Sequence, residues 1–152
     1  MNIQVIPVED RFLEAWQGLY RGYAGFYAVP ITDATLQTVW AWLHDEAHPL
    51  EGLLATDGEA ILGLAHYRAM RRPLQGQEIG FLDDLFVRSD ARGRRIGEAL
   101  LKRVGAIARE RGWSCVRWLT AEDNYRARTL YDRLAKKSRF KLYEIAVAGT
   151  EV

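Results

Sequence analysis

Hydrophobic residues in the first half of the chain recur at spacings that predict a strand and two helices. Residues 3–6 are typical of a short strand, which Pro7 closes. Asp10 is expected to cap the first helix, and Gly22 or Gly25 to end it. The apolar positions at helical spacing are Phe12, Trp16, Leu19, Tyr20 and Tyr23 in the first helix and Leu36, Val39, Trp40 and Leu43 in the second, which follows Thr32 and Asp33.

A hairpin is predicted after the two helices. Residues 53–56 and 60–67 read as its strands, and Asp57 with Gly58 is typical of a type I′ turn. Residues 70–77 are expected to form a polar connection. Residues 79–87 then form a nearly continuous apolar run, which indicates a strand covered on both faces.

The second half alternates helix, strand, helix and strand. We expect a helix with a stripe of Ile96, Leu100, Val104 and Ile107 that ends at Gly112, a strand at 115–120, a helix at 124–135 and a closing strand at 140–147. The connection from residue 79 to 120 is long enough to join two parallel strands through a helix, and such crossovers are right-handed. The loop before that helix therefore lies at the carboxyl edge of a strand.

Length and composition indicate a single soluble domain over residues 1–152. The chain is 49% hydrophobic and 27% charged, which argues against wholesale disorder. No apolar run is long enough to span a membrane, and the N-terminus lacks the features of a secretory signal. The single cysteine, Cys115, excludes an internal disulfide framework and a cysteine-based zinc cluster. We expect a cytoplasmic protein without a metal.

The net charge of +1 conceals a strong polarity along the chain. Residues 1–87 carry five basic and twelve acidic residues, residues 88–112 carry eight and three, and residues 113–152 carry eight and five. An acidic first half and a basic second half are compatible with two charged ligands of opposite sign, or with charges that only face solvent.

The segment 88–98 has the composition of an anion site. It places Gly93, Gly97 and several arginines just before a predicted helix, whose N-terminal amides and dipole attract a phosphate. The segment contains neither a P-loop nor the dinucleotide-binding Gly-x-Gly-x-x-Gly string.

Two segments resemble the acetyltransferases of the GNAT family. Residues 82–87 followed by 92–97 are similar to the family's acetyl-CoA signature, and residues 124–131 are similar to its second conserved block. The string from Trp118 to Phe140 resembles the subgroup that includes a yeast histone and polyamine acetyltransferase. The resemblance implies a mixed α/β fold, with a mostly antiparallel central sheet flanked by helices and a parallel strand pair that splays apart.

The resemblance also implies where acetyl-CoA binds. The pantetheine arm would pair with a strand edge, the pyrophosphate would sit on the amides before the helix, and Asn124 with Arg128 would contact pantetheine or phosphate. Arg95 departs from the pattern, because the family commonly has a glycine there. The implied cofactor-binding residues are Leu85, Phe86, Val87, Arg92, Gly93, Arg94, Arg95, Ile96, Gly97, Glu98, Asn124 and Arg128.

Catalysis is assigned to three residues. An amine must lose a proton before it attacks a thioester, so Asp83 or Asp84 is expected to bind the amine or act as a base through water. Because neighbouring strand residues point to opposite faces, one of the two faces the acceptor, and we favour Asp83. Tyr131 matches the family tyrosine that would protonate the departing thiolate. His66 either lines the acceptor cleft or is a structural histidine.

The sequence therefore predicts an acetyl-CoA-dependent N-acetyltransferase that acts on a primary amine by direct attack in a ternary complex. The acidic first half favours a small cationic amine or a protein lysine as acceptor, and the family resemblance favours a homodimer, in which the segment 140–147 could form the interface. Two alternatives are a CoA-binding regulator without catalysis and a basic nucleic-acid-binding module.

Overall fold

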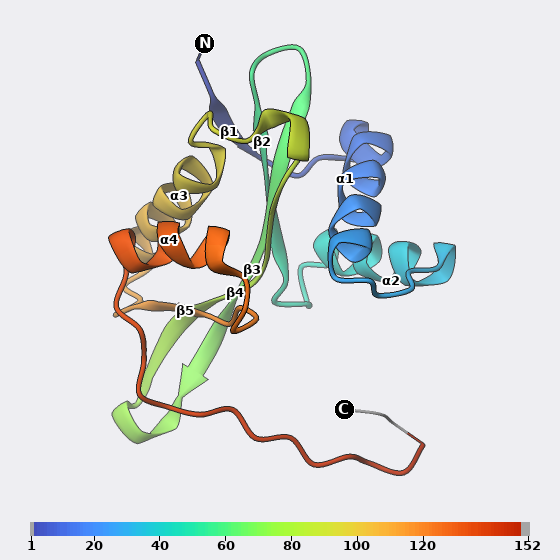
Figure 1. The fold of residues 1–152 in the computed structure, drawn as a ribbon. Coiled ribbons are helices and arrows are strands. Elements are labelled where there is room, and N and C mark those ends of the chain that lie inside the picture. The colour runs from blue at the N-terminus through green and yellow to red at the C-terminus, as the bar shows by residue number, and fades with distance from the viewer. Residues whose placement is uncertain (1, 150–152) are drawn as a thin grey trace. The chain divides into compact units, whose positions relative to one another are not determined.

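The computed structural model describes residues 2–149, which fall into a first compact unit up to Leu119 and a second from Thr120. Each unit is described by itself below. Figure 1 shows the elements of both along the chain. The first unit contains β1 (Gln4–Pro7), α1 (Leu13–Phe26), α2 (Asp33–Leu43), β2 (Glu51–Thr56), β3 (Ile61–Arg72), β4 (Gln77–Val87), α3 (Ile96–Glu110) and β5 (Val116–Trp118), and the second contains α4 (Tyr125–Leu134).

The first unit is built on one five-stranded sheet in the order β1-β2-β3-β4-β5. Neighbouring strands are antiparallel except β4 and β5, which are parallel, as the predicted crossover requires. This mixed, mostly antiparallel sheet confirms the predicted fold class.

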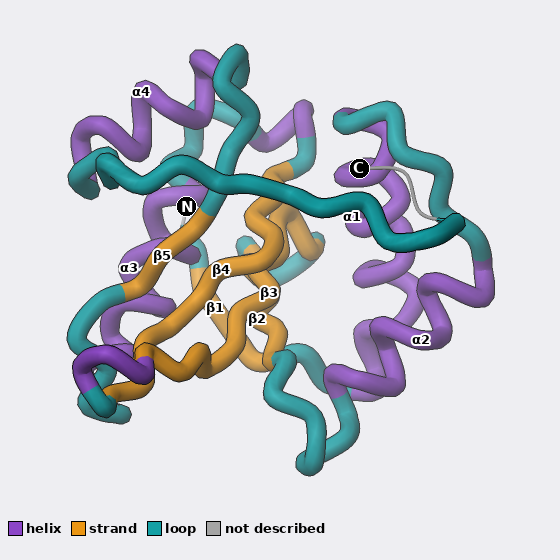
Figure 2. The backbone as a smooth tube through the Cα atoms, turned by 90° about the horizontal axis from the view of Figure 1, so that it is seen from below, coloured by secondary structure: helices purple, strands orange, loops and turns teal. Residues whose placement is uncertain are grey.

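Helices cover both faces of the sheet, with α3 on one face and α1 and α2 on the other (Figure 2). Leu100 and Val104 of α3 pack in one hydrophobic cluster, and Trp16 of α1 with Leu36 of α2 packs in the other. Burial on both sides explains why β4 is nearly continuous in apolar residues.

The ends of α1 differ from the prediction. A 3-10 turn at Asp10–Phe12 precedes the helix, and the Asp10 carboxylate binds the His44 ring at 3.0 Å instead of capping α1. The helix continues through both predicted terminal glycines to Phe26. A tertiary partner has replaced the local cap here. The second helix begins as predicted, because Thr32 Oγ1 accepts a hydrogen bond from the Thr35 amide.

The β2–β3 hairpin is present, but its turn is not type I′. That turn needs positive φ at two residues, and only Gly58, at +99°, has it. The Asp57 carboxylate instead accepts hydrogen bonds from the amides of Glu59 and Ala60 and shapes a longer turn. The predicted connection 70–77 is shorter in the structure, since β3 pairs with β4 up to Arg72 and Gln77, and only residues 73–76 form the turn between them.

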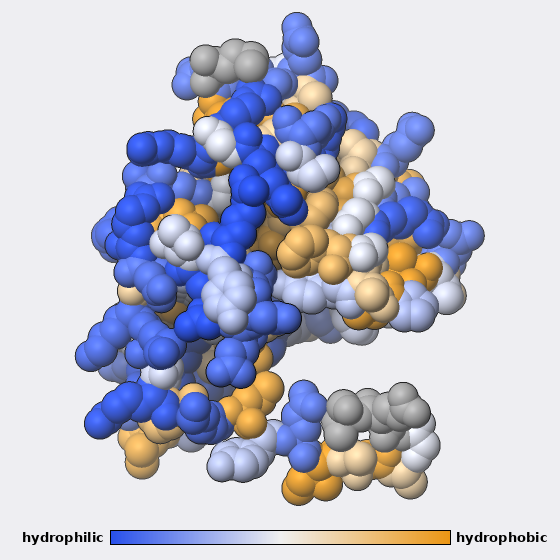
Figure 3. Space-filling view, in the orientation of Figure 1, coloured by the Kyte–Doolittle hydropathy of each residue, from blue (hydrophilic) through white to orange (hydrophobic). Residues whose placement is uncertain are grey.

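The second unit corrects one prediction. Residues 140–147 form no strand, because no described strand pairs with their backbone. Figure 3 shows apolar residues in this segment, and Phe140, Tyr143 and Ile145 are 79%, 88% and 89% exposed. An apolar, β-branched composition favours a strand, but a strand also needs a hydrogen-bonding partner.

Candidate active site

A β-bulge on β4 brings both predicted catalytic carboxylates to the same face of the sheet. His66 pairs with Asp84 and Tyr67 with Leu82, so Asp83 is an extra residue without a partner in the register. The Asp84 side chain binds His66, and the Asp83 side chain binds Arg68, two residues further along the same face. The expectation that strand alternation separates the two carboxylates is therefore wrong, since the bulge interrupts the alternation.

Asp84 lies in a buried hydrogen-bonded cluster between the sheet and α1. Its Oδ2 atom is 2.8 Å from His66 Nδ1 and accepts a hydrogen bond of 2.9 Å from the Tyr20 hydroxyl. The His66 ring is fully buried, and its other nitrogen, Nε2, accepts a hydrogen bond of 2.9 Å from the Trp16 indole. The carboxylate itself keeps 17% exposure, so it remains accessible to a small ligand.

The cluster holds Asp84 as an anion. Burial raises the pKa of Asp84, but the hydrogen bond and the electrostatic interaction with His66, together with hydrogen bonds from Tyr20 and Tyr23, outweigh burial and lower the pKa below its usual value. Burial and the Asp84 carboxylate raise the pKa of both Tyr20 and Tyr23. Both tyrosines are therefore hydrogen-bond donors and not bases at neutral pH.

Asp83 has a different environment. The Arg68 Nε atom donates to both of its oxygens, at 2.9 and 3.2 Å. The same guanidinium lies 4.8 Å from the centre of the Phe81 ring. The charge of Asp83 is thus neutralised by a neighbouring side chain, whereas the partners of Asp84 are uncharged hydroxyls and a ring whose Nε2 accepts a hydrogen bond.

The strand edge that is expected to bind pantetheine is open in the first unit. β5 pairs with only Gly80, Phe81 and Leu82, while β4 continues to Val87. Residues 85–87 therefore pair with β3 on one side and extend past the last β5 pair on the other. Backbone amides and carbonyls at such an edge can accept an added strand-like ligand.

The loop before α3 has the backbone of an anion site. Gly93 and Arg95 have positive φ, at +85° and +59°, and α3 begins directly after Arg95. The Ala99 amide donates to the Arg95 carbonyl, so the amides of residues 96–98 precede the first bond of the helix. The Arg95 side chain is 81% exposed, so an arginine at the usual glycine position extends away from the turn.

The charged side chains of this loop have distinct partners. Arg94 binds the Asp57 carboxylate at 3.3 Å, and the Arg92 guanidinium lies 5.9 Å from the centre of the Phe26 ring. Glu98 is buried, 3.8 Å from Arg95 and 3.7 Å from Lys102. The arginines of this loop therefore already have neighbours within the protein.

Three predicted site residues lie in the second unit. Asn124 is the N-cap residue of α4, and its amide donates to Thr120 Oγ1 at 3.2 Å. Arg128 binds the Glu122 carbonyl, and Tyr131 is half-buried on α4. Their roles toward acetyl-CoA remain predictions from the sequence motif.

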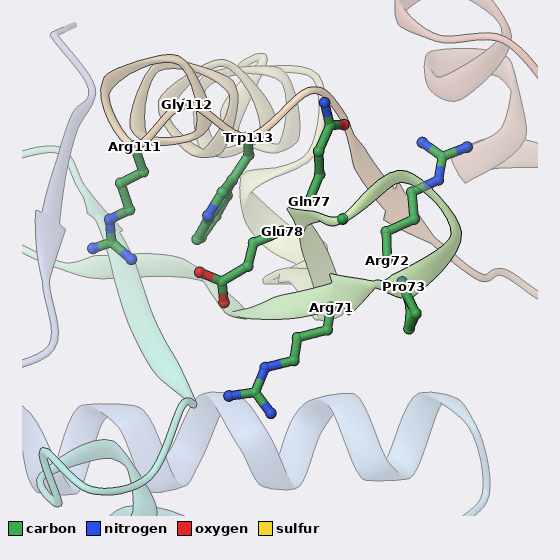
Figure 4. A pocket seen from close by; sticks show the side chains of 9 residues that line it. Arg71, Arg72, Pro73, Gln77, Glu78, Arg111, Gly112 and Trp113 are labelled. Atoms are coloured by element: carbon green, nitrogen blue, oxygen red, sulfur yellow. The ribbon is translucent and has the colours of Figure 1, made fainter.

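A cavity of about 600 Å³ lies at the start of β4, away from the predicted site (Figure 4). It is lined by Arg71, Glu78 and Trp113, among others. Arg71 stands opposite Glu78 in the β3–β4 register, and Arg111 at the rim binds Glu51. None of the residues predicted to bind a ligand lines this cavity.

The sequence did not single out Trp16, Tyr20 and Tyr23 as site residues. They occupy a helical stripe, which is the ordinary pattern of a core. Trp16 binds His66 across 50 positions of the sequence, and Tyr20 binds Asp84 across 64. Contacts at such separations leave no local signal in the sequence.

In residues 2–149, no group of three or more His, Cys, Asp or Glu side chains is arranged to hold a metal ion. In the same residues, no helix has both the length and the apolar character needed to cross a bilayer.

Comparison with known proteins gives a family match over most of the chain. Residues 16–135 match the sequence profile of the Acetyltransferase (GNAT) family. The D-amino-acid N-acetyltransferase HPA3 of Saccharomyces cerevisiae is 33% identical over 145 residues, which cover 94% of this chain and 90% of the yeast protein.

Solved structures share the fold at lower identity. The ribosomal-protein-alanine N-acetyltransferase of Brucella melitensis superposes with a TM-score of 0.81 at 22% identity, and covers 97% of this chain and 100% of that one. AAC(6')-Iy, solved in complex with the bisubstrate analogue CoA-S-monomethyl-acetylneamine, superposes with a TM-score of 0.79 at 18% identity. The match covers 97% of this chain and 100% of that one.

Proposed function

Because this chain belongs to the Acetyltransferase (GNAT) family and is an acyltransferase, we propose that it moves the acetyl group of acetyl-CoA to a primary amine by direct attack in a ternary complex. One observation carries the proposal: the open edge of β4 directly follows the carboxylate cluster of Asp83 and Asp84 along the strand. A thioester aligned on that edge would lie beside an anion that can hold an amine.

The residues present fit acetyl-CoA, which would supply an acetyl group activated as a thioester. The backbone of Leu85, Phe86 and Val87 would pair with the pantetheine arm. The amides from Gly93 to Glu98, next to the positive end of the α3 dipole, would hold the pyrophosphate. Asn124 and Arg128 would complete the contacts to pantetheine and phosphate.

The proposed residues divide the proton chemistry between them. Asp84 would orient the protonated amine through an ion pair. Asp83 would then receive a proton of the amine, directly or through water, when its ion pair with Arg68 opens. The neutral nitrogen would form a bond to the acetyl carbon as the carbon–sulfur bond breaks. Tyr131 would give its proton to the departing sulfur, because a phenol that is well positioned can protonate a thiolate. The surplus proton on the acylated nitrogen would then pass through water to the Tyr131 phenolate.

The acceptor we propose is a small cationic amine or a lysine side chain. Residues 1–87, which include α1 and both carboxylates, carry twelve acidic and five basic residues, and this charge favours a cation. The names of the relatives point to amine acceptors as well: HPA3 is named for D-amino acids, and AAC(6')-Iy was solved with an acetylneamine analogue.

We also propose that the enzyme is a homodimer in the cytoplasm. The exposed apolar segment 140–147 is the surface that a second copy would cover, because large exposed apolar patches mark interfaces. The free thiol of Cys115 is compatible with a reducing compartment. Light scattering of the wild type and of Ile145→Asp tests the dimer. A monomeric wild type, or a variant dimer as stable as the wild type, contradicts it.

The enzyme assay measures thiol release from acetyl-CoA with a panel of 1,4-diaminobutane, D-lysine, L-lysine, D-alanine, neamine and a lysine peptide. Turnover with at least one amine, detected also as the acetylated product by mass spectrometry, supports the proposal. Acetyl-CoA binding without turnover across the panel favours the CoA-binding regulator. Salt-dependent RNA binding without acetyl-CoA binding favours the nucleic-acid module.

A further inference from the structure

The contacts of His66 fix which of its nitrogens carries the proton. The ring is fully buried, its Nε2 accepts a hydrogen bond from the Trp16 indole, and its Nδ1 lies 2.8 Å from Asp84. An indole N–H can only donate, so Nε2 must present its lone pair. The proton of the neutral ring is therefore on Nδ1, where it is donated to Asp84.

A ring in this state is a poor proton acceptor. Nδ1 already carries a proton, and the lone pair of Nε2 is engaged by Trp16. The edge of the Tyr20 ring contacts it as well, with the ring centres 4.9 Å apart. Taking a proton from an amine would break the Trp16 bond inside a buried cluster, so His66 can orient Asp84 but is not placed to act as a base.

The carboxylate of Asp84 can accept a further hydrogen bond from a ligand. His66 and Tyr20 both bind Oδ2, and Tyr23 also hydrogen-bonds to the carboxylate, whose two oxygens together offer about four acceptor sites. The partial exposure of Asp84 gives a further donor access from solvent. An anion whose protein partners are neutral donors is well suited to bind a cation.

Aromatic rings extend from Asp84 along α1. Tyr20 and Tyr23 of α1 and the C-cap residue Tyr27 form one stripe, with centre-to-centre distances of 6.0 Å and 5.0 Å between successive rings. The edge of Tyr23 also contacts Phe86 on β4. Tyrosine faces attract cations and pack on alkyl chains.

We propose that His66 is a positioning residue for the amine acceptor, which it serves by donating its Nδ1 proton to Asp84 and so aiming that carboxylate at a primary ammonium on an alkyl chain. Trp16 fixes the tautomer that makes this donation possible, and the tyrosine stripe flanks the alkyl chain. This inference rests on the proposed function, since it assigns residues to the acceptor of that reaction.

Kinetics of two amide variants test the role. His66→Asn places an amide N–H near the position of Nδ1, whereas the amide of His66→Gln lies near Nε2 and does not reach Asp84. With the panel amine that the wild type acetylates best, we expect His66→Gln to raise KM for the amine at least tenfold and His66→Asn no more than threefold. KM for acetyl-CoA should stay within twofold in both.

A matched control is His48→Gln, because His48 stacks on Trp42 away from the cluster. This variant should leave kcat and both KM values within twofold of the wild type. Equal kinetic effects of the Asn and Gln variants, or equal rises in both KM values, would reveal a merely structural role and overturn the proposal. Unchanged kinetics in both variants would overturn it too.

The tautomer can be measured without turnover. In NMR spectra of the wild type labelled with ¹⁵N-histidine, the ring signals that vanish in His66→Gln are those of His66, and at pH 7 they should show the proton on Nδ1. A His66 ring protonated on Nε2, or on both nitrogens, contradicts the proposal. Absence of turnover by the wild type would count against the proposed function, while this measurement still decides how His66 meets Asp84.

Discussion

The Trp16 indole on α1 donates a hydrogen bond to His66 Nε2 on β3 across 50 positions of the sequence. Both side chains are fully buried, and the His66 ring joins this bond to the Asp84 carboxylate on β4. One chain of polar contacts thus connects a helix and two strands inside an otherwise apolar core. Such a connected network specifies a single arrangement of the elements that it joins.

Trp16→Phe should destabilise the first unit, because it leaves the buried Nε2 acceptor of His66 without a donor. The expected loss is about 2 kcal/mol of unfolding free energy in urea denaturation. Trp42→Phe is the matched control, since Trp42 is 41% exposed, and it should cost no more than about 0.5 kcal/mol. Equal losses in the two variants would show that the buried hydrogen bond contributes nothing.

Gly80→Ala should also be destabilising, for a steric reason. A Cβ atom at Gly80 would lie 2.7 Å from Trp113 Cε3 and 3.1 Å from Val116 Cγ2. Overpacking of this kind costs about 1–3 kcal/mol. Gly105→Ala in α3, where a Cβ meets nothing within 4 Å, should instead stabilise by about 0.5–1 kcal/mol. Thermal unfolding of the two variants should show a loss of stability for Gly80→Ala and a gain for Gly105→Ala. A Gly80→Ala variant as stable as the wild type would contradict the close packing.

Arg95→Gly should be more stable than Arg95→Ala by about 1 kcal/mol. Arg95 has the left-handed conformation that costs a side-chain-bearing residue about 1–2 kcal/mol, and glycine adopts it freely. Both variants lose the exposed contact to Glu98, so their difference isolates the backbone. Chemical denaturation checks it. Equal stabilities would mean that the turn relaxes when the arginine is removed.

Thr32→Ala should remove the cap of α2. The Thr32 hydroxyl accepts the Thr35 amide at 3.1 Å, and loss of such a cap costs about 1 kcal/mol. Thr38→Ala is the control, because its hydroxyl only donates to the Ala34 carbonyl within the helix. Urea denaturation should show a clear loss for the first variant and a change within about 0.5 kcal/mol for the second. A loss confined to Thr38→Ala would contradict the cap.

Asp84 should contribute to the acid sensitivity of the fold. Its pKa is lower in the folded chain than in the unfolded one, so the stabilisation is complete above the unfolded value of about 3.9. It is lost as the pH falls from there through the folded pKa. Unfolding free energies measured from pH 6 to pH 2 should therefore fall less steeply for Asp84→Asn than for the wild type. Parallel curves would contradict the lowered pKa.

Much of the fold follows from local patterns. The stripe of Leu36 and Val39, with Thr32 before it, predicts α2 with its cap, and the apolar run through Ile79 predicts the strand β4. These signals are readable because periodicity reports which face of an element is buried. The positive φ of Gly112 after α3 was predictable for the same local reason, since helices commonly end on such a glycine.

Other features depend on contacts between distant residues. Asp10 binds His44 instead of capping α1, and β3 extends to Arg72 because β4 pairs with it there. The apolar segment 140–147 has the composition of a strand, yet no described strand pairs with it. In each case the local structure depends on whether a distant part of the chain supplies a partner, and local propensity does not report that.

The sequence by itself determined the family resemblance, the order of the elements, the arginine- and glycine-rich loop before α3 and the adjacent pair Asp83 and Asp84. Only the tertiary structure decided that a bulge turns both carboxylates to one face, and that Asp84 meets His66, Tyr20 and Trp16 while Asp83 meets Arg68. The physical reason is that a motif is a property of neighbours in sequence. The charge and orientation of a buried carboxylate depend on the donors that packing brings within 3 Å of it.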